Sequence, residues 1–151
     1  MAEFNLNMTI WTDIGKIEVT LFPERAPTAI SILKKSASRE VPVHFYGKEI
    51  FFGLDEKTYY NANKLDEELK KEGQKEIFEI GEVAFWRGRR DIPLTDPLNP
   101  GSCICIFFGN TPEADEPRAL EPITLIGKVI TNLELCEKLN NENIIKIEKI
   151  N

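Results

Sequence analysis

The sequence predicts one mainly β domain that spans residues 1–151. Apolar and polar residues alternate with period two in several short segments, a pattern typical of strands with one buried face. Helical spacing appears at two positions far apart in the chain, and most of the other connections are short turns. Together these observations indicate a closed β-barrel with helices at its ends, although periodicity alone also allows an open α+β sheet.

The clearest predicted strand contains Ile17, Val19 and Leu21, which alternate with polar residues. A turn signal at residues 13–15 makes residues 9–11 the expected first arm of a hairpin. Further strands are predicted at residues 43–45, 49–52, 78–86, 103–108 and 123–130, and around residues 145–147.

Two helices are predicted at the ends of the barrel. The first begins at Pro27, because proline suits the first turn of a helix and apolar residues follow it at spacings of three and four. The second opens with Thr131 and Glu134, which are spaced as a capping box, and carries Leu135 and Leu139 on one face.

Residues 55–74 are interpreted as an insertion with a short helix of its own. Leu65 and Leu69 lie four residues apart, and Gly73 marks the expected end of the helix. The acidic residues 66–68 come before the basic residues 70–71, an order that complements the helix dipole. The high density of charge predicts a solvated surface helix.

Composition narrows the functional classes. The chain carries a net charge of −6, which argues against general binding to nucleic acid or anionic membranes. No apolar run approaches the roughly 20 residues needed to cross a bilayer, and no secretory signal is apparent, so we expect a cytoplasmic protein. Three cysteines, too few for a disulfide framework, fit a reducing compartment. The oligomeric state is left open.

Several segments together resemble a cyclophilin in order and spacing. Near the N-terminus the similar segment is residues 15–29 (GKIEVTLFPERAPTA). Towards the other end of the chain the similar segments are residues 101–106 (GSCICI) and 126–129 (IGKV). Residues 79–86 (EIGEVAFW) and 106–112 (IFFGNTP) are also similar to small prokaryotic cyclophilin-like proteins of unassigned function. The resemblance implies a closed cyclophilin-like β-barrel capped by two helices, and it selects this fold over an open sheet.

The resemblance also implies which chemistry to expect. Rotation about a peptide bond faces a barrier of about 18–20 kcal/mol, and the two isomers of an X-Pro bond exchange slowly. In cyclophilins an arginine donates a hydrogen bond to the prolyl nitrogen, a glutamine and backbone groups hold the substrate, and apolar side chains seat the proline ring. Such placed donors stabilise the twisted transition state electrostatically.

This chain departs from the family pattern at the residues that carry that chemistry. The strand that holds the family's arginine corresponds to residues 49–52, which contain none. Cys103 replaces the substrate-holding glutamine, Cys105 replaces an aromatic residue of the proline pocket, and Ile123 replaces a histidine. We therefore predict a remodelled, inactive prolyl-isomerase site that binds a peptide or small ligand in a groove beside the barrel.

The predicted groove takes its lining and its anchors from separate parts of the chain. Arg87 and Arg90 are the candidate anchors, because they follow a tryptophan in a loop that leads back to Gly101. A solvated basic loop balanced by nearby aspartates is the alternative. The predicted lining residues are Phe52, Trp86, Cys103, Cys105 and Ile123.

Two further functional alternatives remain at this stage. One is an active peptidyl-prolyl isomerase with a relocated arginine drawn from Arg87, Arg89 or Arg90, and the other is an interaction scaffold without a small ligand. No metal or cofactor is predicted, because Cys103 and Cys105 are expected to pack as small hydrophobes. His44, the one histidine, lacks a nucleophile with which to form a triad.

Overall fold

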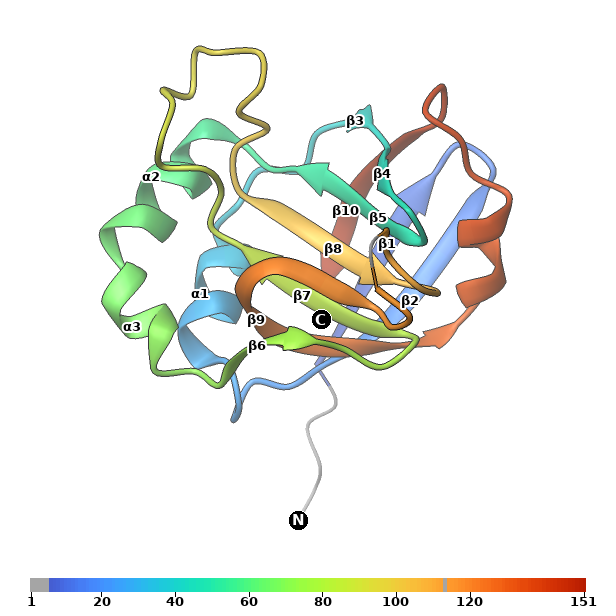
Figure 1. Ribbon diagram of the computed structural model, residues 1–151, viewed down its shortest axis with the longest axis horizontal. Helices are drawn as coiled ribbons and strands as arrows, with labels where there is room; N and C mark the ends of the chain where they lie inside the picture. Colours follow the sequence, from blue (N-terminus) through green and yellow to red (C-terminus); the bar gives the residue numbers. More distant parts are fainter. Residues whose placement is uncertain (1–5, 113) are drawn as a thin grey trace.

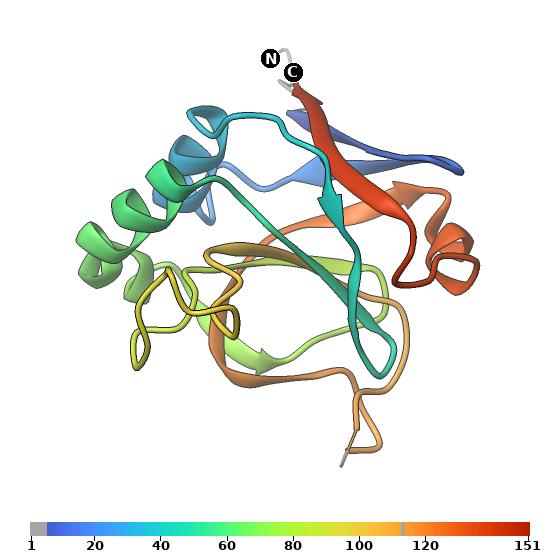
Figure 2. The ribbon, with the colours of Figure 1, turned by 90° about the horizontal axis from the view of Figure 1, so that it is seen from above.

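The computed structural model describes residues 6–112 and 114–151, and over these residues its ten strands form one antiparallel sheet. The strands are β1 Asn7–Thr12, β2 Gly15–Leu21, β3 Val41–Pro42, β4 His44–Tyr46, β5 Glu49–Gly53, β6 Gln74–Ile77, β7 Glu82–Trp86, β8 Cys103–Phe107, β9 Arg118–Thr131 and β10 Ile144–Ile150. Figures 1 and 2 show the sheet curling on itself with the α-helices gathered on one side. The prediction of a mainly β fold is confirmed.

The strands follow the order β3-β10-β1-β2-β9-β7-β8-β5-β4, with β6 added beside β9. This path begins at β3 and ends at β4, so in the described part of the chain the pairing does not close into a ring, and the closed barrel is not confirmed. The two end strands are consecutive in sequence and flank Val43, whose N–H donates to the Asn143 carbonyl at 3.2 Å. Pro42 in β3 has no N–H with which to extend a ladder.

The sheet is apolar on both faces where β5, β8 and β7 lie side by side. Ile50, Phe52 and Ile104 belong to the main core inside the curl. Phe51 and Cys105, one residue away in sequence, belong to a second apolar cluster on the outer face. This arrangement explains the uninterrupted apolar run of β8, because alternate residues are buried on opposite sides.

Helix α1 (Pro27–Lys34) begins at the predicted proline and buries its apolar side against the sheet and the other helices. Its first turn has a partner from elsewhere in the chain: the Glu72 carboxylate accepts hydrogen bonds from the N–H groups of Thr28 at 2.8 Å and Ala29 at 3.2 Å. A carboxylate in this position satisfies free amide donors and complements the helix dipole.

The insertion contains two helices where one was predicted, α2 (Glu56–Lys64) and α3 (Asp66–Lys70). The prediction of a solvated surface helix is wrong for the inner side of this segment, where Tyr59, Asp66 and Leu69 are buried. Both helices pack on α1. None of the helices over residues 6–112 and 114–151 is long and apolar enough to cross a membrane.

The predicted capping box at Thr131 is wrong, because β9 continues through that residue. Asn132 follows with a left-handed backbone (φ 74°), which asparagine tolerates better than most residues, and its side chain donates to the Lys16 carbonyl at 2.8 Å. The helix after it is a short 3-10 helix, η1 (Leu133–Glu137), with Leu135 buried as expected. The second predicted helix is therefore a short segment of a tighter helix.

Candidate functional site

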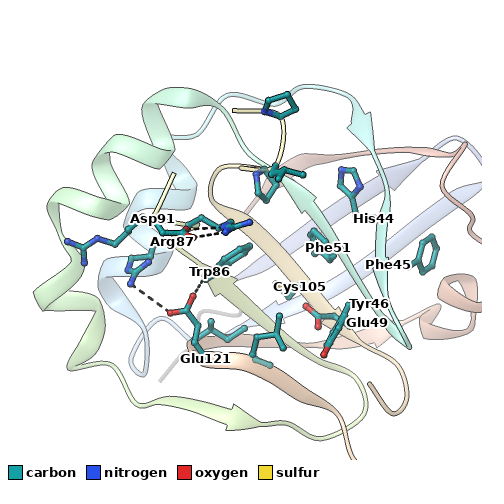
Figure 3. A pocket seen from close by; sticks show the side chains of 18 residues that line it. His44, Phe45, Tyr46, Glu49, Phe51, Trp86, Arg87, Asp91, Cys105 and Glu121 are labelled. Atoms are coloured by element: carbon teal, nitrogen blue, oxygen red, sulfur yellow. Dashed lines mark hydrogen bonds and ion pairs between the residues drawn. The ribbon is translucent and has the colours of Figure 1, made fainter. Parts of the chain in front are cut away.

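A cavity of about 800 Å³ lies on the outer face of the sheet, over β5, β8, β7 and β9 (Figure 3). Its volume falls within the range of about 300–1,000 Å³ that is typical of small-molecule sites. The lining residues are His44, Phe45, Tyr46, Glu49, Phe51, Trp86, Arg87, Arg89, Arg90, Asp91, Pro97, Leu98, Pro100, Cys105, Ala119, Leu120, Glu121 and Ile123.

The floor of the cavity is apolar and comes from neighbouring strands. Phe51 of β5 lies opposite Cys105 of β8, and Trp86 of β7 and Ile123 of β9 extend the same surface. The ring of His44 stacks on Phe51 with its centroid 5.3 Å away and an interplanar angle of 29°. The outer cluster of the sheet is thus partly open, and its exposed side forms a ready-made apolar contact surface.

The structure brings five of the predicted site residues together at this cavity and leaves two outside its lining. Those that line it are Trp86, Arg87, Arg90, Cys105 and Ile123. Phe52 is 1% exposed and belongs to the inner core, because β5 presents Phe51 to the outer face. Cys103 is on the outer face but fully buried, directly across from Trp86 in the strand ladder.

Two of the three arginines, Arg87 and Arg90, contact one buried carboxylate, and of these Arg87 is mostly buried whereas Arg90 is 53% exposed. Asp66 is 5% exposed and accepts from Arg87 Nε at 2.7 Å and from Arg90 Nη1 at 2.8 Å, with the Lys70 ammonium 3.4 Å away. Burial alone raises the pKa of Asp66, but hydrogen bonds and charges from Arg87 and Lys70 outweigh burial and hold the pKa below its ordinary value. This end of the cavity is therefore a charged cluster with a fixed geometry.

The loop that carries the arginines is held by hydrogen bonds at several points. Ser102 Oγ donates to the Arg87 carbonyl at 2.7 Å, Asn99 Nδ2 donates to the Ile92 carbonyl at 3.0 Å, and the Tyr59 hydroxyl donates to the Arg89 carbonyl. Gly88 adopts φ +102°, and a Cβ there would lie 2.6 Å from the Gly101 carbonyl oxygen, so no larger residue fits. The interpretation as a solvated basic loop holds in part: Arg90 and Asp91 are exposed, but Arg87 is mostly buried and the loop backbone is fixed by these hydrogen bonds.

Glu121 and Asp91 complete the pairing of the basic groups. Glu121 accepts a hydrogen bond from Trp86 Nε1 at 2.8 Å, and its other oxygen lies 3.8 Å from Arg87. Arg89 makes a two-pronged contact with Asp91, at 3.0 and 2.6 Å. Each of the three arginines therefore has a carboxylate partner within the protein. Figure 3 shows the contact of Glu121 with Arg87 and Trp86.

A further carboxyl group, that of Glu49, lies at the other end of the cavity, beside Cys105 and Tyr46 (Figure 3). Glu49 is 7% exposed, and burial raises its pKa from 4.5 to about 7, while a hydrogen bond from the Cys105 thiol opposes that rise. Sequence reasoning missed this residue. The available signal was a charged residue two positions before Phe51, on the same face of a predicted strand that is otherwise apolar.

The cysteines are free thiols buried in apolar surroundings. Burial and the nearby Glu49 raise the pKa values of Cys103 and Cys105 above the ordinary thiol value, and burial with Glu137 raises that of Cys136 to about 12. Such thiols are poor nucleophiles and pack as small hydrophobes. Within residues 6–112 and 114–151 no group of three or more His, Cys, Asp or Glu side chains is arranged to hold a metal ion.

Comparison with known proteins gives a family and a fold. Residues 6–148 match a family model described as cyclophilin-like. A hypothetical protein from Archaeoglobus fulgidus has a TM-score of 0.68 and 23% identity, covering 99% of this chain and 100% of that one. A cyclophilin-type peptidyl-prolyl cis-trans isomerase from Cryptosporidium parvum has a TM-score of 0.52 and 16% identity, covering 97% and 96%. No curated protein matches significantly.

Proposed function

The chain belongs to the cyclophilin-like family, and from that premise we propose that it binds a small ligand or peptide in the outer-face cavity without the family's isomerase mechanism. The observation that carries this proposal is a cavity of about 800 Å³ with an apolar floor and arginines already committed to carboxylates. The fold alone does not assign a function, whereas these side chains specify what the cavity can bind.

The hydrogen bonds that Arg87 and Arg90 already make argue against isomerase chemistry. A catalyst for prolyl rotation needs a donor aimed at the nitrogen of the twisted bond. By resemblance that donor comes from β5, which here presents Phe51 to the cavity. Arg87 and Arg90 donate to the buried Asp66, so redirecting either one toward a substrate requires breaking a charge-assisted hydrogen bond.

The rim of the cavity favours a binding role. Leu98 is 71% exposed and Leu120 is 81% exposed, and both line the opening. Large apolar side chains left in solvent next to an apolar floor mark a surface that gains free energy when a ligand covers it. A peptide or a compact apolar molecule has the shape to do so. We also propose a cytoplasmic location, because three free thiols suit a reducing compartment.

We expect the protein to leave the cis-trans exchange rate of an Ala-Pro peptide unchanged. The measurement is NMR exchange spectroscopy on a proline-containing tetrapeptide at millimolar concentration with and without the protein. A strong acceleration that disappears in Arg87→Ala or Arg90→Ala would establish the relocated-arginine mechanism. It would contradict our proposal that the protein lacks isomerase activity.

Binding at the cavity is expected to change the fluorescence of Trp86. The chain has two tryptophans, so the experiment uses Trp11→Phe, which leaves Trp86 as the single reporter. Apolar peptides and aromatic metabolites are titrated, and Phe51→Ala is expected to weaken the ligands that bind by roughly tenfold, since it removes a floor side chain worth about 1.5–3 kcal/mol when fully covered.

Ile80→Ala is the matched control for that titration, because Ile80 is a 55% exposed apolar residue that does not line the cavity. It should leave every affinity unchanged. A panel in which no peptide or metabolite alters the Trp86 signal would favour the interaction scaffold over the ligand-binding function.

A further inference from the structure

Glu49 is the one cavity-lining carboxyl group that has no cationic partner in residues 6–112 and 114–151. β5 begins at this residue and directs it to the outer face, in register with Tyr46 of β4 on one side and Phe107 of β8 on the other. It is more than nine-tenths buried, yet it lines the cavity. The Cys105 thiol is a weak donor and supplies no charge.

The charged groups around Glu49 are engaged elsewhere. Lys48, its neighbour in sequence, places its ammonium 3.1 Å from Glu137, and Glu82 of β7 is paired with Lys75 at 2.8 Å. On β4 the side chain of His44 stacks on Phe51. From the facing segment of β9 the cavity is lined by Ala119, Leu120 and Ile123, which are apolar, and by Glu121, which holds Trp86.

A buried carboxylate without a partner is costly. Moving such a group away from water is favourable only if a cation or several hydrogen-bond donors compensate it. At the arginine end Asp66 has cationic partners in Arg87, Arg90 and Lys70. At the other end Glu49 has no cationic partner among the described residues. Features that reduce stability in this way are characteristic of binding and catalytic sites.

From this asymmetry we propose that the ligand carries a protonated amine and that Glu49 binds it, while the apolar floor takes the hydrocarbon or aromatic body. This inference rests on the proposed binding function and specifies the class of its ligand. An ammonium group is the compact cation that a single carboxylate accommodates. At the opposite end the carboxylates are already paired with arginines, so among the described residues Glu49 is the cavity-lining carboxylate left free to bind the amine.

Two probes that differ only in charge test the proposal: 4-phenylbutylamine and 4-phenylbutan-1-ol. Isothermal titration calorimetry at pH 8.5 is expected to show the amine binding at least tenfold more tightly than the alcohol. Glu49→Gln should reduce the amine to the affinity of the alcohol and leave the alcohol unchanged. Glu142→Gln, which makes the same change in net charge on an exposed turn, should alter neither.

The pH dependence provides an independent readout. An alkyl amine with a pKa of about 10.4 stays protonated from pH 5.5 to pH 8.5, so any change in its affinity over that range comes from the protein. The amine is expected to bind at least tenfold more weakly at pH 5.5, where Glu49 is protonated, and the alcohol to bind equally at both values. In ¹³C NMR, saturating amine should lower the titration midpoint of the Glu49 carboxyl carbon.

The outcomes separate the inference from the function on which it rests. Equal affinities for the two probes, or an amine preference that survives in Glu49→Gln, overturns the role of Glu49 while leaving a working apolar groove. A preference abolished by Glu121→Gln instead would move the amine site to the arginine end and also overturn the proposal. If neither probe binds at millimolar concentration, the amine inference fails, and the Trp86 titration decides separately whether the cavity binds other ligands.

Discussion

Glu49→Gln is expected to make the protein more stable than the wild type by about 3 kcal/mol at pH 9. The pKa of Glu49 rises from 4.5 in the unfolded chain to about 7 in the folded protein, and each unit of that difference corresponds to about 1.4 kcal/mol. Ionising a buried carboxyl group costs the folded state this free energy, whereas glutamine of nearly the same shape stays neutral at every pH.

The sign of the pH dependence follows from the direction of the shift. Between pH 4.5 and pH 7 the folded wild type binds more protons than the unfolded chain, so its free energy of unfolding falls as the pH rises. This contribution is complete below pH 4.5 and is lost once the pH passes about 7. The advantage of Glu49→Gln should therefore be close to zero at pH 4.5, grow through neutral pH and become constant above it.

Urea denaturation of the two proteins at intervals from pH 4.5 to pH 9 measures this difference directly. Taking the difference cancels the titrations that both proteins share. Glu142→Gln serves as the control and should track the wild type within about 0.5 kcal/mol, as is usual for exposed substitutions. A gap between Glu49→Gln and the wild type that does not change with pH would show that Glu49 is not an uncompensated buried acid.

Asp66→Ala is expected to have an effect of similar size and opposite sign, a loss of about 3 kcal/mol at pH 7. Removing one partner of a buried ion pair leaves the other uncompensated, and here the mostly buried Arg87 loses its contact at 2.7 Å. Arg90 and Lys70 also lose contacts, but both are about half exposed and stay solvated. The cavity wall should loosen at the same time, which hydrogen exchange of the amides in residues 87–92 would record as faster exchange.

Glu67→Ala is the matched control, because Glu67 lies on the same helix and contacts the same Lys70 ammonium at 3.2 Å but is exposed. A surface pair of this kind contributes little, so the change should stay below about 0.5 kcal/mol. Because the pKa of Asp66 is lowered, its contribution is present at neutral pH and is lost as the pH falls below 3.8. Equal losses in both variants at pH 7 would contradict the importance of the buried cluster.

Local patterns predicted the strands and the first helix because short-range physics determines them. The alternation through Ile17, Val19 and Leu21 became β2, with all three side chains buried, and Pro27 became the first residue of α1. Thr131 was misread because a capping box and the end of a strand are compatible with the same residues. Whether β9 continued depended on its pairing with β2, where Thr131 lies opposite Glu18.

The site was predicted in part, and the misses have physical causes. Phe51 and Phe52 are both apolar because both faces of β5 are covered, so alternation gave no contrast with which to choose the residue that faces the cavity. The pairing of Asp66 with Arg87 joins positions 21 residues apart, and no periodicity reports such a contact. Glu49 was visible as a charged residue in an otherwise apolar predicted strand, but the sequence did not show that the face on which it lies is buried.

The position of β1 between β2 and β10 has a consequence for the order of folding. The hairpin of β1 and β2 requires only residues 7–21, whereas the other edge of β1 pairs with residues 145–150, near the far end of the chain. During synthesis one edge of β1 therefore remains without its native partner until residues 145–150 have left the ribosome. Contacts that join such distant residues slow folding and prolong the exposure of a strand edge to other chains.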